Sequence, residues 1–412
     1  MKRHRSLWFV WVTAAVAAGA AQDPPREWID PSTGHRVLRL SDEPGTASLY
    51  FHQNPYTASG DKMVVSTPRG LGTITLATRT NAPLVEGRVS HLVVGRKTRQ
   101  AFYIQNGAVF ATNVDTGATR KILEDARLRT GSGFGLSADE TVLAGSFVEG
   151  DASAIRPPGS ARPGGSSLPA GTAPANPLAT PPPTASSLER RWAARLPMAL
   201  YTIDVRSGEL KTIYRSSDWL NHVQMSPADS TLIMFCHEGP WHFVDRIWTI
   251  RTDGRERTLR HKRTMDMEIA GHEFFSADGR TIWYDLQTPK SKVFWLAGVE
   301  IGTGQTTRYA VAREEWSVHF NVSPDGKLFA GDGGGPRSVA APGNGQWIYL
   351  FTPTREGTLA AERLVDLSKH DYQLEPNVTF TPDQKWITFR SNMHGATHVY
   401  AVEVAKPKGP EL

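Results

Sequence analysis

The sequence predicts an all-β protein, a seven-bladed β-propeller. A short turn containing Ser or Thr and Asp recurs between two apolar strands, and no stretch shows long helical periodicity. The strands around these turns alternate apolar and polar residues and are bounded by Gly, Asp and Asn, which is typical of antiparallel hairpins. Six of these turns lie at residues 58–61, 137–139, 226–229, 276–279, 323–326 and 381–384, and a seventh, degenerate copy (Gly-Arg-Lys) lies at 95–97.

The spacing of these turns matches one blade. Measured at residues 61, 97, 139, 229, 278, 325 and 383, the intervals are 36, 42, 90, 49, 47 and 58 residues. Four-stranded propeller blades are about 40–50 residues long. The interval of 90 contains residues 152–187, which are rich in Pro, Gly, Ala and Ser. Such a composition cannot bury a core, so we expect a disordered insertion within a single domain, residues 22–412.

Two strands without partners predict how the ring closes. His35–Ser41 reads as a lone early strand, and Val399–Val404 ends the chain's last blade without a fourth strand. Pairing of the two would complete the seventh blade. A pair of stacked β-sheets is the alternative fold, but seven similar turns favour the propeller.

The N-terminus has the pattern of a secretory signal peptide. Basic residues at positions 2–5 precede an apolar stretch, Leu7 to Ala18, and then Ala-Gly-Ala at 18–20. The apolar stretch is short for a membrane span, which needs about 20 residues. We therefore expect residues 1–21 to be removed and the protein to be exported, periplasmic or secreted, with no membrane span. An uncleaved anchor is the alternative.

Composition narrows the classes of partner. The net charge is +5, and the basic residues are scattered rather than clustered. We therefore expect no nucleic-acid partner, while anionic substrates remain open. Cys236 is the one cysteine, so no internal disulfide can form. The sequence leaves the oligomeric state open.

Polar residues recur at positions that a propeller would bring together. In a blade, the Asp turn joins the first two strands at one face, so their other ends meet at the opposite face, near the channel. The positions six to nine residues before the turns hold His52, His91, His222, His272, His319 and Asn377. The ends of the second strands hold Cys236, His237, Glu238, Asp285, Asp332 and Asn392.

Histidines at one rim indicate either metal binding or proton transfer, or contacts that hold adjacent blades together. Imidazole binds metals and transfers protons near neutral pH. We expect His52, His222, His319 and Asp332 to contact the substrate. His272 with Glu375 and Asn377 would give mixed nitrogen and oxygen ligands that suit a divalent ion such as Mn²⁺.

Two arginines are candidates for binding a substrate carboxylate. A guanidinium group can hold a carboxylate through two parallel hydrogen bonds, which Arg215 and Arg246 could both provide. The alternative for Arg246 is a salt bridge with the adjacent Asp245.

The segment Phe235–Pro240 (FCHEGP), followed by Val244–Trp248 (VDRIW), resembles the oligogalacturonate lyases. Gly271–Phe274 is also similar to that family, as are the turn at 325–326 and the closing segment Phe380–Asp383. The resemblance runs in order from about residue 27 to residue 405, apart from the insertion. It implies a seven-bladed propeller with a Mn²⁺ site at the channel mouth.

The resemblance also implies an activity, the cleavage of short galacturonides by β-elimination. In that reaction a base removes the C5 proton, a metal and cationic groups stabilise the enolate-like carboxylate, and the C4–O bond breaks. His237 matches the family's active-site histidine and is our candidate proton donor. Arg246 matches a family arginine. The position of the family's arginine base holds Asp218, so Arg215, three residues earlier, is the nearest substitute.

The metal ligands implied by the resemblance are changed in this chain. His272 matches a family ligand. The family's Gln and His-Pro-His are represented by Gln373, offset by one position, and by Glu375-Pro376-Asn377. The chain therefore reads as a divergent member. Two alternatives stay open: a lyase for another uronate polymer, and a non-catalytic propeller that binds glycans or envelope partners.

Overall fold

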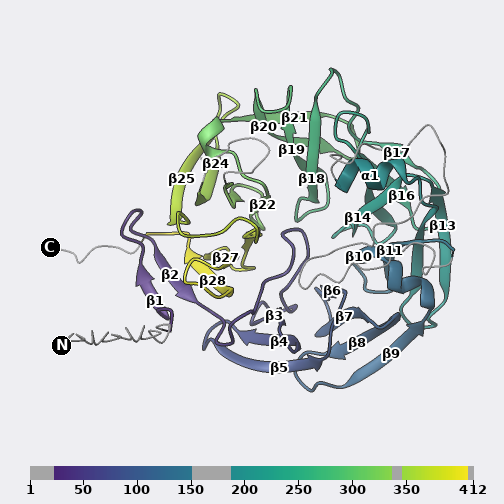
Figure 1. The fold of residues 1–412 in the computed structure, drawn as a ribbon, viewed down its shortest axis with the longest axis horizontal. Coiled ribbons are helices and arrows are strands. Elements are labelled where there is room, and N and C mark those ends of the chain that lie inside the picture. Colours follow the sequence, from purple (N-terminus) through teal and green to yellow (C-terminus); the bar gives the residue numbers. More distant parts are fainter. Residues whose placement is uncertain (1–22, 151–186, 336–345, 407–412) are drawn as a thin grey trace, which may run out of the picture.

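The computed structural model describes residues 23–150, 187–335 and 346–406. The predicted signal peptide and nearly all of the predicted insertion lie outside these residues. Within them the chain forms seven β-sheets arranged as blades around one axis (Figure 1). The prediction of a seven-bladed propeller is confirmed. Among the described residues, no helix has the length and apolar character needed to cross a bilayer.

The blades follow one another along the chain. Blade 1 contains β3 (Lys62–Thr67), β4 (Gly70–Thr75) and β5 (Thr80–Glu86). Blade 2 contains β6 (His91–Val94), β7 (Gln100–Gln105), β8 (Ala108–Asn113) and β9 (Thr119–Glu124). Blade 3 contains β10 (Ser132–Leu136), β11 (Val142–Val148), β12 (Met198–Asp204) and β13 (Leu210–Ser216). Blade 4 contains β14 (Trp219–Met225), β15 (Leu232–Glu238), β16 (Ile247–Arg251) and β17 (Thr258–Leu259).

Blades 5 and 6 have the same order of strands, and blade 7 also takes in two strands from the start of the chain. Blade 5 contains β18 (Ile269–Phe275), β19 (Thr281–Gln287), β20 (Phe294–Glu300) and β21 (Thr306–Val311). Blade 6 contains β22 (Phe320–Val322), β23 (Phe329–Gly331), β24 (Trp347–Pro353) and β25 (Leu359–Asp366). Blade 7 contains β26 (Thr379–Phe380), β27 (Trp386–Ser391), β28 (His398–Glu403), β2 (Arg36–Arg39) and β1 (Glu27–Ile29). The first strand of each four-stranded blade lies next to the channel (Figure 1).

The two ends of the chain close the ring in blade 7. Strand β2 pairs with β28 in antiparallel register, with Leu38 opposite Ala401 and Val37 opposite Val402. The predicted closure is confirmed, and β1 adds a fifth strand outside it. Closure removes the two free blade edges that an open ring would leave.

The recurring Asp turns share one hydrogen-bond pattern. The Ser276 hydroxyl donates to Asp278 Oδ1 at 2.6 Å, and the same carboxylate oxygen accepts the backbone N–H of Arg280 at 3.1 Å. Ser323 with Asp325 and Thr381 with Asp383 repeat this contact at 2.7 and 2.6 Å. A short side chain that bonds its own turn is why Ser, Thr and Asp recur at these positions.

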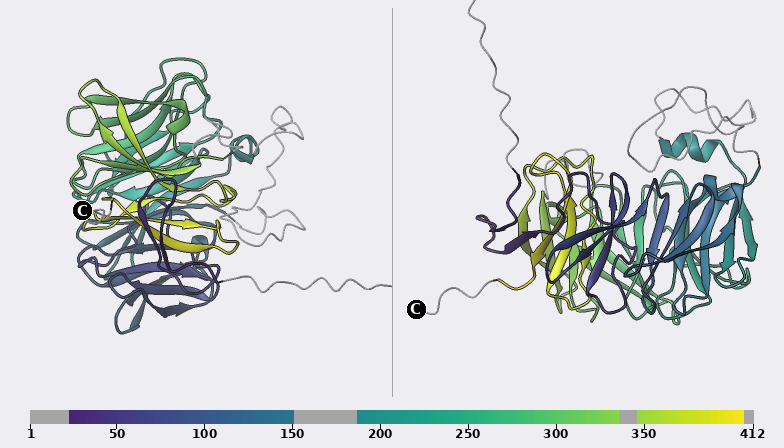
Figure 2. Two further views of the ribbon diagram at one scale, coloured as in Figure 1. Left: turned by 90° about the vertical axis from the view of Figure 1, so that its left-hand side faces the viewer. Right: turned by 90° about the horizontal axis from the view of Figure 1, so that it is seen from below.

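The described residues also include helix α1 (Ser187–Ala193) and 3-10 turns at Ala126–Thr130 and Arg313–Glu315. Helix α1 stands above one face of the disc (Figure 2). Its Trp192 ring stacks on Phe243 at 5.8 Å, in the segment after β15. A Cβ on Gly239 would come within 2.7 Å of Trp192, so this approach requires a glycine.

The innermost position of blade 1 is irregular. Ala47 pairs with Ser66 and Tyr56 with Met63 in isolated bridges, so the ends of this segment lie where an inner strand would be. Between the bridges the chain leaves the sheet and enters the channel (Figure 1, purple loop at the centre). We call residues 48–55 the channel loop. It carries Tyr50, Phe51 and His52 into the middle of the ring.

Candidate functional site

Three of the five predicted rim histidines surround the channel loop, and the loop itself carries a fourth, His52. The His319 ring lies 4.7 Å from Phe51 and 5.2 Å from Tyr50, measured between ring centroids. His272 lies 4.7 Å from His319, and His222 lies 6.0 Å from His52. Blades 4, 5 and 6 and the channel loop thus bring their histidines to one mouth of the channel.

His91 does not join this group. Its Nε2 lies 3.1 Å from the carbonyl oxygen of Gly131, at the start of the next blade. His91 therefore links blades 2 and 3. This is the structural role that the sequence left open as the alternative to a chemical role for a rim histidine.

β-Bulges shape the inner strands of blades 4 and 5. The register shifts between Asn221 and Gln224 in β14 and between Gly271 and Phe274 in β18. His222 and His272 sit in these bulges with φ of 48° and 49°. A non-glycine residue in this region is uncommon, and bulges often re-aim a side chain beside a functional site.

Two of the histidines are braced by buried carboxylates. His272 Nδ1 lies 2.8 Å from Asp285 Oδ1, and His319 Nδ1 lies 2.7 Å from Asp332 Oδ2. A carboxylate on Nδ1 keeps the proton there and leaves Nε2 as the basic nitrogen. Asp332, predicted to contact the substrate, is fully buried and instead orients His319.

Tyr50 extends the pair of His319 and Asp332 to a third group. Its hydroxyl lies 3.2 Å from His319 Nε2. The backbone N–H of Asn377 also donates to Asp332 Oδ2 at 3.1 Å, which fixes the carboxylate. Burial, and then the negative charge of Glu375, raises the pKa of Tyr50 well above its usual value. Tyr50 is therefore protonated and able to donate.

The histidines differ in charge because their surroundings differ. Burial and the neighbouring His222 lower the pKa of His52 to about 3. Burial also lowers the pKa of His222. For His272, burial acts in the same direction, but the Asp285 carboxylate outweighs it, and the pKa is raised. His52 and His222 are thus neutral near pH 7, while His272 is the most basic of the three.

Arg246 lies in a buried ion-pair group rather than in an open position. Its Nε is 3.2 Å from Glu273 Oε2, and Nη1 is 3.5 Å from Glu238 Oε1. Burial by itself would raise the pKa of Glu273, but the positive charge of Arg246 outweighs burial and lowers this pKa to about 2. Both carboxylates contact the guanidinium, so Arg246 is not free to clamp a substrate. Its predicted alternative partner, Asp245, bonds Arg263 instead.

His237, the predicted proton donor, faces away from the channel group. Side chains alternate along a strand, so His237 points to the other face of β15 from Cys236 and Glu238. It packs 5.2 Å from the Trp248 ring, and its Nδ1 lies 2.8 Å from Asp218 Oδ2. The structure does not support a role for His237 beside the rim histidines.

Arg215 also lies outside the group. It is on β13, the outermost strand of blade 3, where its side chain is 65% exposed and pairs with Glu149 at 2.9 Å. The exchange of Asp for the family's arginine is therefore not compensated by Arg215. Asp218 itself is bonded to Arg195 and His237.

The four predicted metal ligands do not form one site. Gln373 is exposed in a surface turn. Asn377 is fully buried, and its side-chain oxygen accepts the Phe51 N–H at 3.1 Å while its nitrogen donates to the Glu375 carbonyl at 3.0 Å. Glu375 reaches the rim, with a carboxylate oxygen 3.8 Å from His319 Nε2. Asn377 thus positions the channel loop, and this set of residues does not fit a manganese ion.

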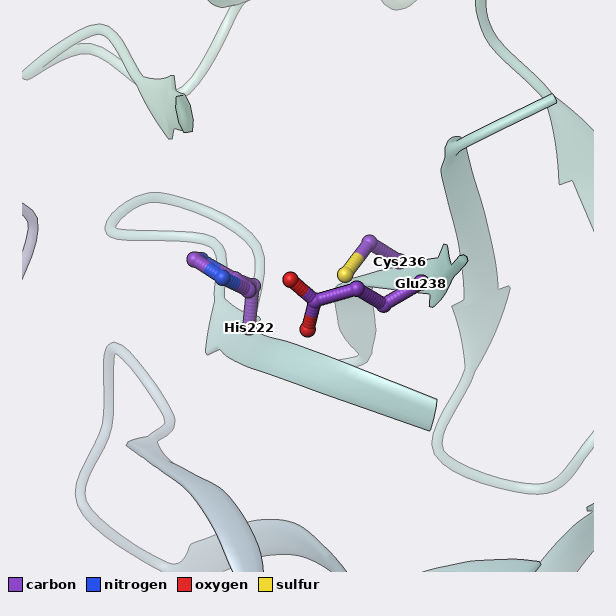
Figure 3. Close-up of side chains that lie close together, drawn as sticks. All are labelled: His222, Cys236 and Glu238. Atoms are coloured by element: carbon purple, nitrogen blue, oxygen red, sulfur yellow. The ribbon is translucent and has the colours of Figure 1, made fainter. Parts of the chain in front are cut away.

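A different set of donors does converge, in blade 4. One ligand atom each of His222, Cys236 and Glu238 lies within 4.8 Å of the other two (Figure 3). The sequence motif FCHEGP contains two of these residues. Their relation to His222 depends on the register of β14 and β15, in which Asn221 lies opposite Cys236.

Arg390 is a cation at the channel mouth that sequence reasoning missed. Its Nε donates to the Glu375 carbonyl at 2.7 Å and one Nη to the Ser48 carbonyl at 3.3 Å. Burial lowers its pKa, and the charges of Glu375 and Tyr50 act against this. These bonds to neutral carbonyls leave its charge available. Its position at the end of the second strand of its blade was the signal in the sequence.

The channel loop separates this mouth from a cavity on the side of the Asp turns. The cavity has a volume of about 270 Å³ and is lined by Phe51, His52 and Arg96 and by turn residues such as Pro227 and Pro324. The rim histidines other than His52 do not line it, so the polar site opens at the opposite end of the channel.

Taken together, the fold and the site define a seven-bladed propeller with braced histidines, a tyrosine and buried ion pairs at one channel mouth. Residues 192–407, just over half of the chain, match the family model described as oligogalacturonate lyase. The chain belongs to the oligogalacturonate lyase family.

Curated relatives and solved structures agree with this assignment. The chain is 29% identical over 216 residues to an oligogalacturonide lyase of Pectobacterium atrosepticum and 30% identical over 216 residues to an oligogalacturonate lyase of Dickeya dadantii. Each alignment covers 50% of this chain and 55% of the relative, so the chain spans about half the length of the curated relatives it matches.

Two solved structures share the whole fold. An oligogalacturonate lyase in complex with manganese aligns with a TM-score of 0.73 and 23% identity, covering 92% of this chain and 96% of the other. An oligogalacturonate lyase from Vibrio parahaemolyticus aligns with a TM-score of 0.74, 22% identity and the same coverage. The propeller thus extends well beyond the segment that matches in sequence.

Proposed function

We propose that this protein is a lyase that cleaves short oligogalacturonides by β-elimination at the channel mouth. The observation that carries the proposal is the convergence of His272, His319 and Tyr50, two carboxylate-braced imidazoles and a protonated phenol. Family membership supplies the substrate class.

The reaction needs a base, an acid and a cation. Removal of the C5 proton forms the C4–C5 double bond as the C4–O bond breaks, and the leaving oxygen takes up a proton. His272 Nε2 is our candidate base, because Asp285 holds its Nδ1 and makes it the more basic nitrogen. The Tyr50 hydroxyl is the candidate acid: it gives its proton to the leaving oxygen, the phenolate regains a proton from solvent, and His319 Nε2 positions the hydroxyl.

Arg390 is the candidate partner of the uronate carboxylate. A cation there favours the negative charge that develops on the carboxylate when the C5 proton leaves. Trp241, whose ring lies 6.1 Å from His272, offers an apolar wall beside this position.

We include a divalent metal in the proposal. One related solved structure is a manganese complex. Gln373 is exposed, and Asn377 hydrogen-bonds the channel loop. For this reason none of the steps above depends on manganese at the family's position. A metal bound at the mouth would add positive charge near the uronate carboxylate.

Two other functions are favoured by specific observations. The altered residues Glu375 and Asn377 favour a lyase for another uronate polymer. Asp218, where the family has its arginine base, favours a propeller that binds glycans without cleaving them. We further propose export, on the basis of the N-terminal pattern; N-terminal sequencing of the protein recovered from the periplasm or medium tests this.

The experiment is an ultraviolet assay of the unsaturated product. The purified protein is incubated with oligogalacturonides and, in parallel, with other oligouronides, with and without added Mn²⁺ or Zn²⁺. We expect product from oligogalacturonides. Product from another oligouronide alone would support the first alternative. Binding without product would support the second.

A further inference from the structure

His222, Cys236 and Glu238 meet because of the strand geometry of blade 4. Residues 236 and 238 are two apart in β15 and so lie on the same face. The bulge in β14 places His222 opposite them, next to the pairing of Asn221 with Cys236. Figure 3 shows the Glu238 carboxylate between the imidazole and the sulfur.

Polar atoms around these three residues lack partners. Within the described part of the chain, His222 Nδ1 and Glu273 Oε1 are buried and accept or donate no hydrogen bond. Glu273 is fully buried and lies near the Cys236 thiol. Buried polar atoms are normally satisfied, so an orphaned pair beside a thiol indicates a missing ligand.

The charges are also unbalanced. Glu238 and Glu273 are paired with a single guanidinium, that of Arg246, which leaves one negative charge. A divalent cation that replaced the thiol proton would add one net positive charge. The buried group would then be neutral.

We propose that His222, Cys236 and Glu238 bind a divalent cation of the zinc class. Binding converts the Cys236 thiol to a metal thiolate and releases its proton to solvent. One nitrogen, one sulfur and one oxygen donor suit Zn²⁺ or Co²⁺ better than Mn²⁺, which prefers oxygen ligands. The position is in blade 4, on the wall of the same channel mouth, and not at the family's His272 position.

The required movement is small. Zinc–ligand bonds of about 2.0–2.3 Å put the ligands of a tetrahedral site roughly 3.3–3.8 Å apart. The donor atoms now lie within 4.8 Å of one another. Closing this gap takes about an ångström of side-chain movement. Asn221, whose Nδ2 lies 2.5 Å from Glu238 Oε2, orients that carboxylate from outside.

The binding of this metal does not depend on the proposed lyase function. Only a role for the metal in the reaction rests on that function. The full-length protein is therefore stripped with chelator, reloaded with Zn²⁺ or Co²⁺, and analysed for metal content. We expect one ion per chain and, with Co²⁺, a thiolate charge-transfer band in the near ultraviolet.

Variants locate the ion. Cys236→Ser is expected to abolish the band and to weaken Zn²⁺ binding by more than the roughly 10–100-fold that loss of an outer-shell partner costs. Glu238→Gln is expected to weaken binding while keeping the thiolate band. His272→Ala, at the family's position, is the matched control and is expected to retain both the ion and the band. Circular dichroism of each variant checks that it is folded.

Each contrary result has a defined meaning. Failure of the folded wild-type protein to take up Zn²⁺ or Co²⁺ overturns the inference. Retention of the ion by Cys236→Ser together with its loss in His272→Ala also overturns it and places the metal at the family's position. Metal bound as expected in a protein without lyase activity leaves this inference standing and removes the proposed function.

Discussion

The Tyr50 hydroxyl lies 3.2 Å from His319 Nε2, although 269 residues separate the two in the chain. The channel loop of blade 1 delivers the tyrosine, and blade 6 delivers the histidine with its Asp332 brace. This contact links the two sides of the channel mouth and makes Tyr50 the candidate acid.

Tyr50→Phe removes the hydroxyl and keeps the ring that packs on Phe51 and His319. Because general acid catalysis contributes about 10²–10⁴-fold, we expect kcat to fall by roughly 100-fold or more with little change in melting temperature. Steady-state kinetics and thermal unfolding measure the two effects. A Tyr50→Phe enzyme within twofold of wild type would remove Tyr50 from the mechanism.

Asp285→Asn tests the base through the pH dependence. A base works only when unprotonated, so activity is lost as the pH falls through its pKa. Asp285 raises the pKa of His272 above 6.5, so the acidic limb of kcat/KM should lie above that pH. Removing the carboxylate should move the limb to lower pH and reduce the maximal rate. A limb that stays in place in Asp285→Asn would exclude His272 as the titrating base.

Arg390→Ala and Arg215→Ala distinguish two candidate arginines. Loss of Arg390 removes a cation at the channel mouth, so we expect KM for oligogalacturonides to rise roughly tenfold or more, since a charged hydrogen bond is worth about 1.5–3 kcal/mol. Arg215 pairs with Glu149 on the outermost strand, so its loss should leave kcat/KM within about twofold. The reverse ranking would restore Arg215 to the site.

Arg246→Met tests the buried ion-pair group. Removing the guanidinium leaves Glu238 and Glu273 buried without their counter-charge, and breaking such a pair costs about 3–5 kcal/mol. Arg251→Met is the matched control in the same blade, because its pairs with Asp229 and Glu256 are partly exposed and should contribute less than about 1 kcal/mol. Urea unfolding measures both. Equal losses would show that Arg246 is not held as a buried ion pair.

The sequence predicts where much of the site lies, but it does not predict which residues form the site. Counting back from the Asp turns placed His52, His222, His272 and His319 at one mouth, because the blades repeat the same order of strand, turn and strand. The same counting also included His91, which precedes the degenerate turn at 95–97 and whose neighbour is the Gly131 carbonyl. His237 matches the family's active-site histidine, but alternation along β15 places it on the opposite face from Cys236 and Glu238.

The sequence by itself determined the propeller, because its information is local and repeated. Most of the turns bond their own Asp, the strands alternate with period two, and the leftover strands at the two ends can pair with each other. The tertiary structure alone decided which side chains meet. The channel loop takes the place of an inner strand and brings Tyr50 to His319, the bulges turn His222 and His272, and Asn377 is drawn away to hold Phe51. The contacts of Tyr50 and Asn377 join segments hundreds of residues apart, and no local pattern specifies them.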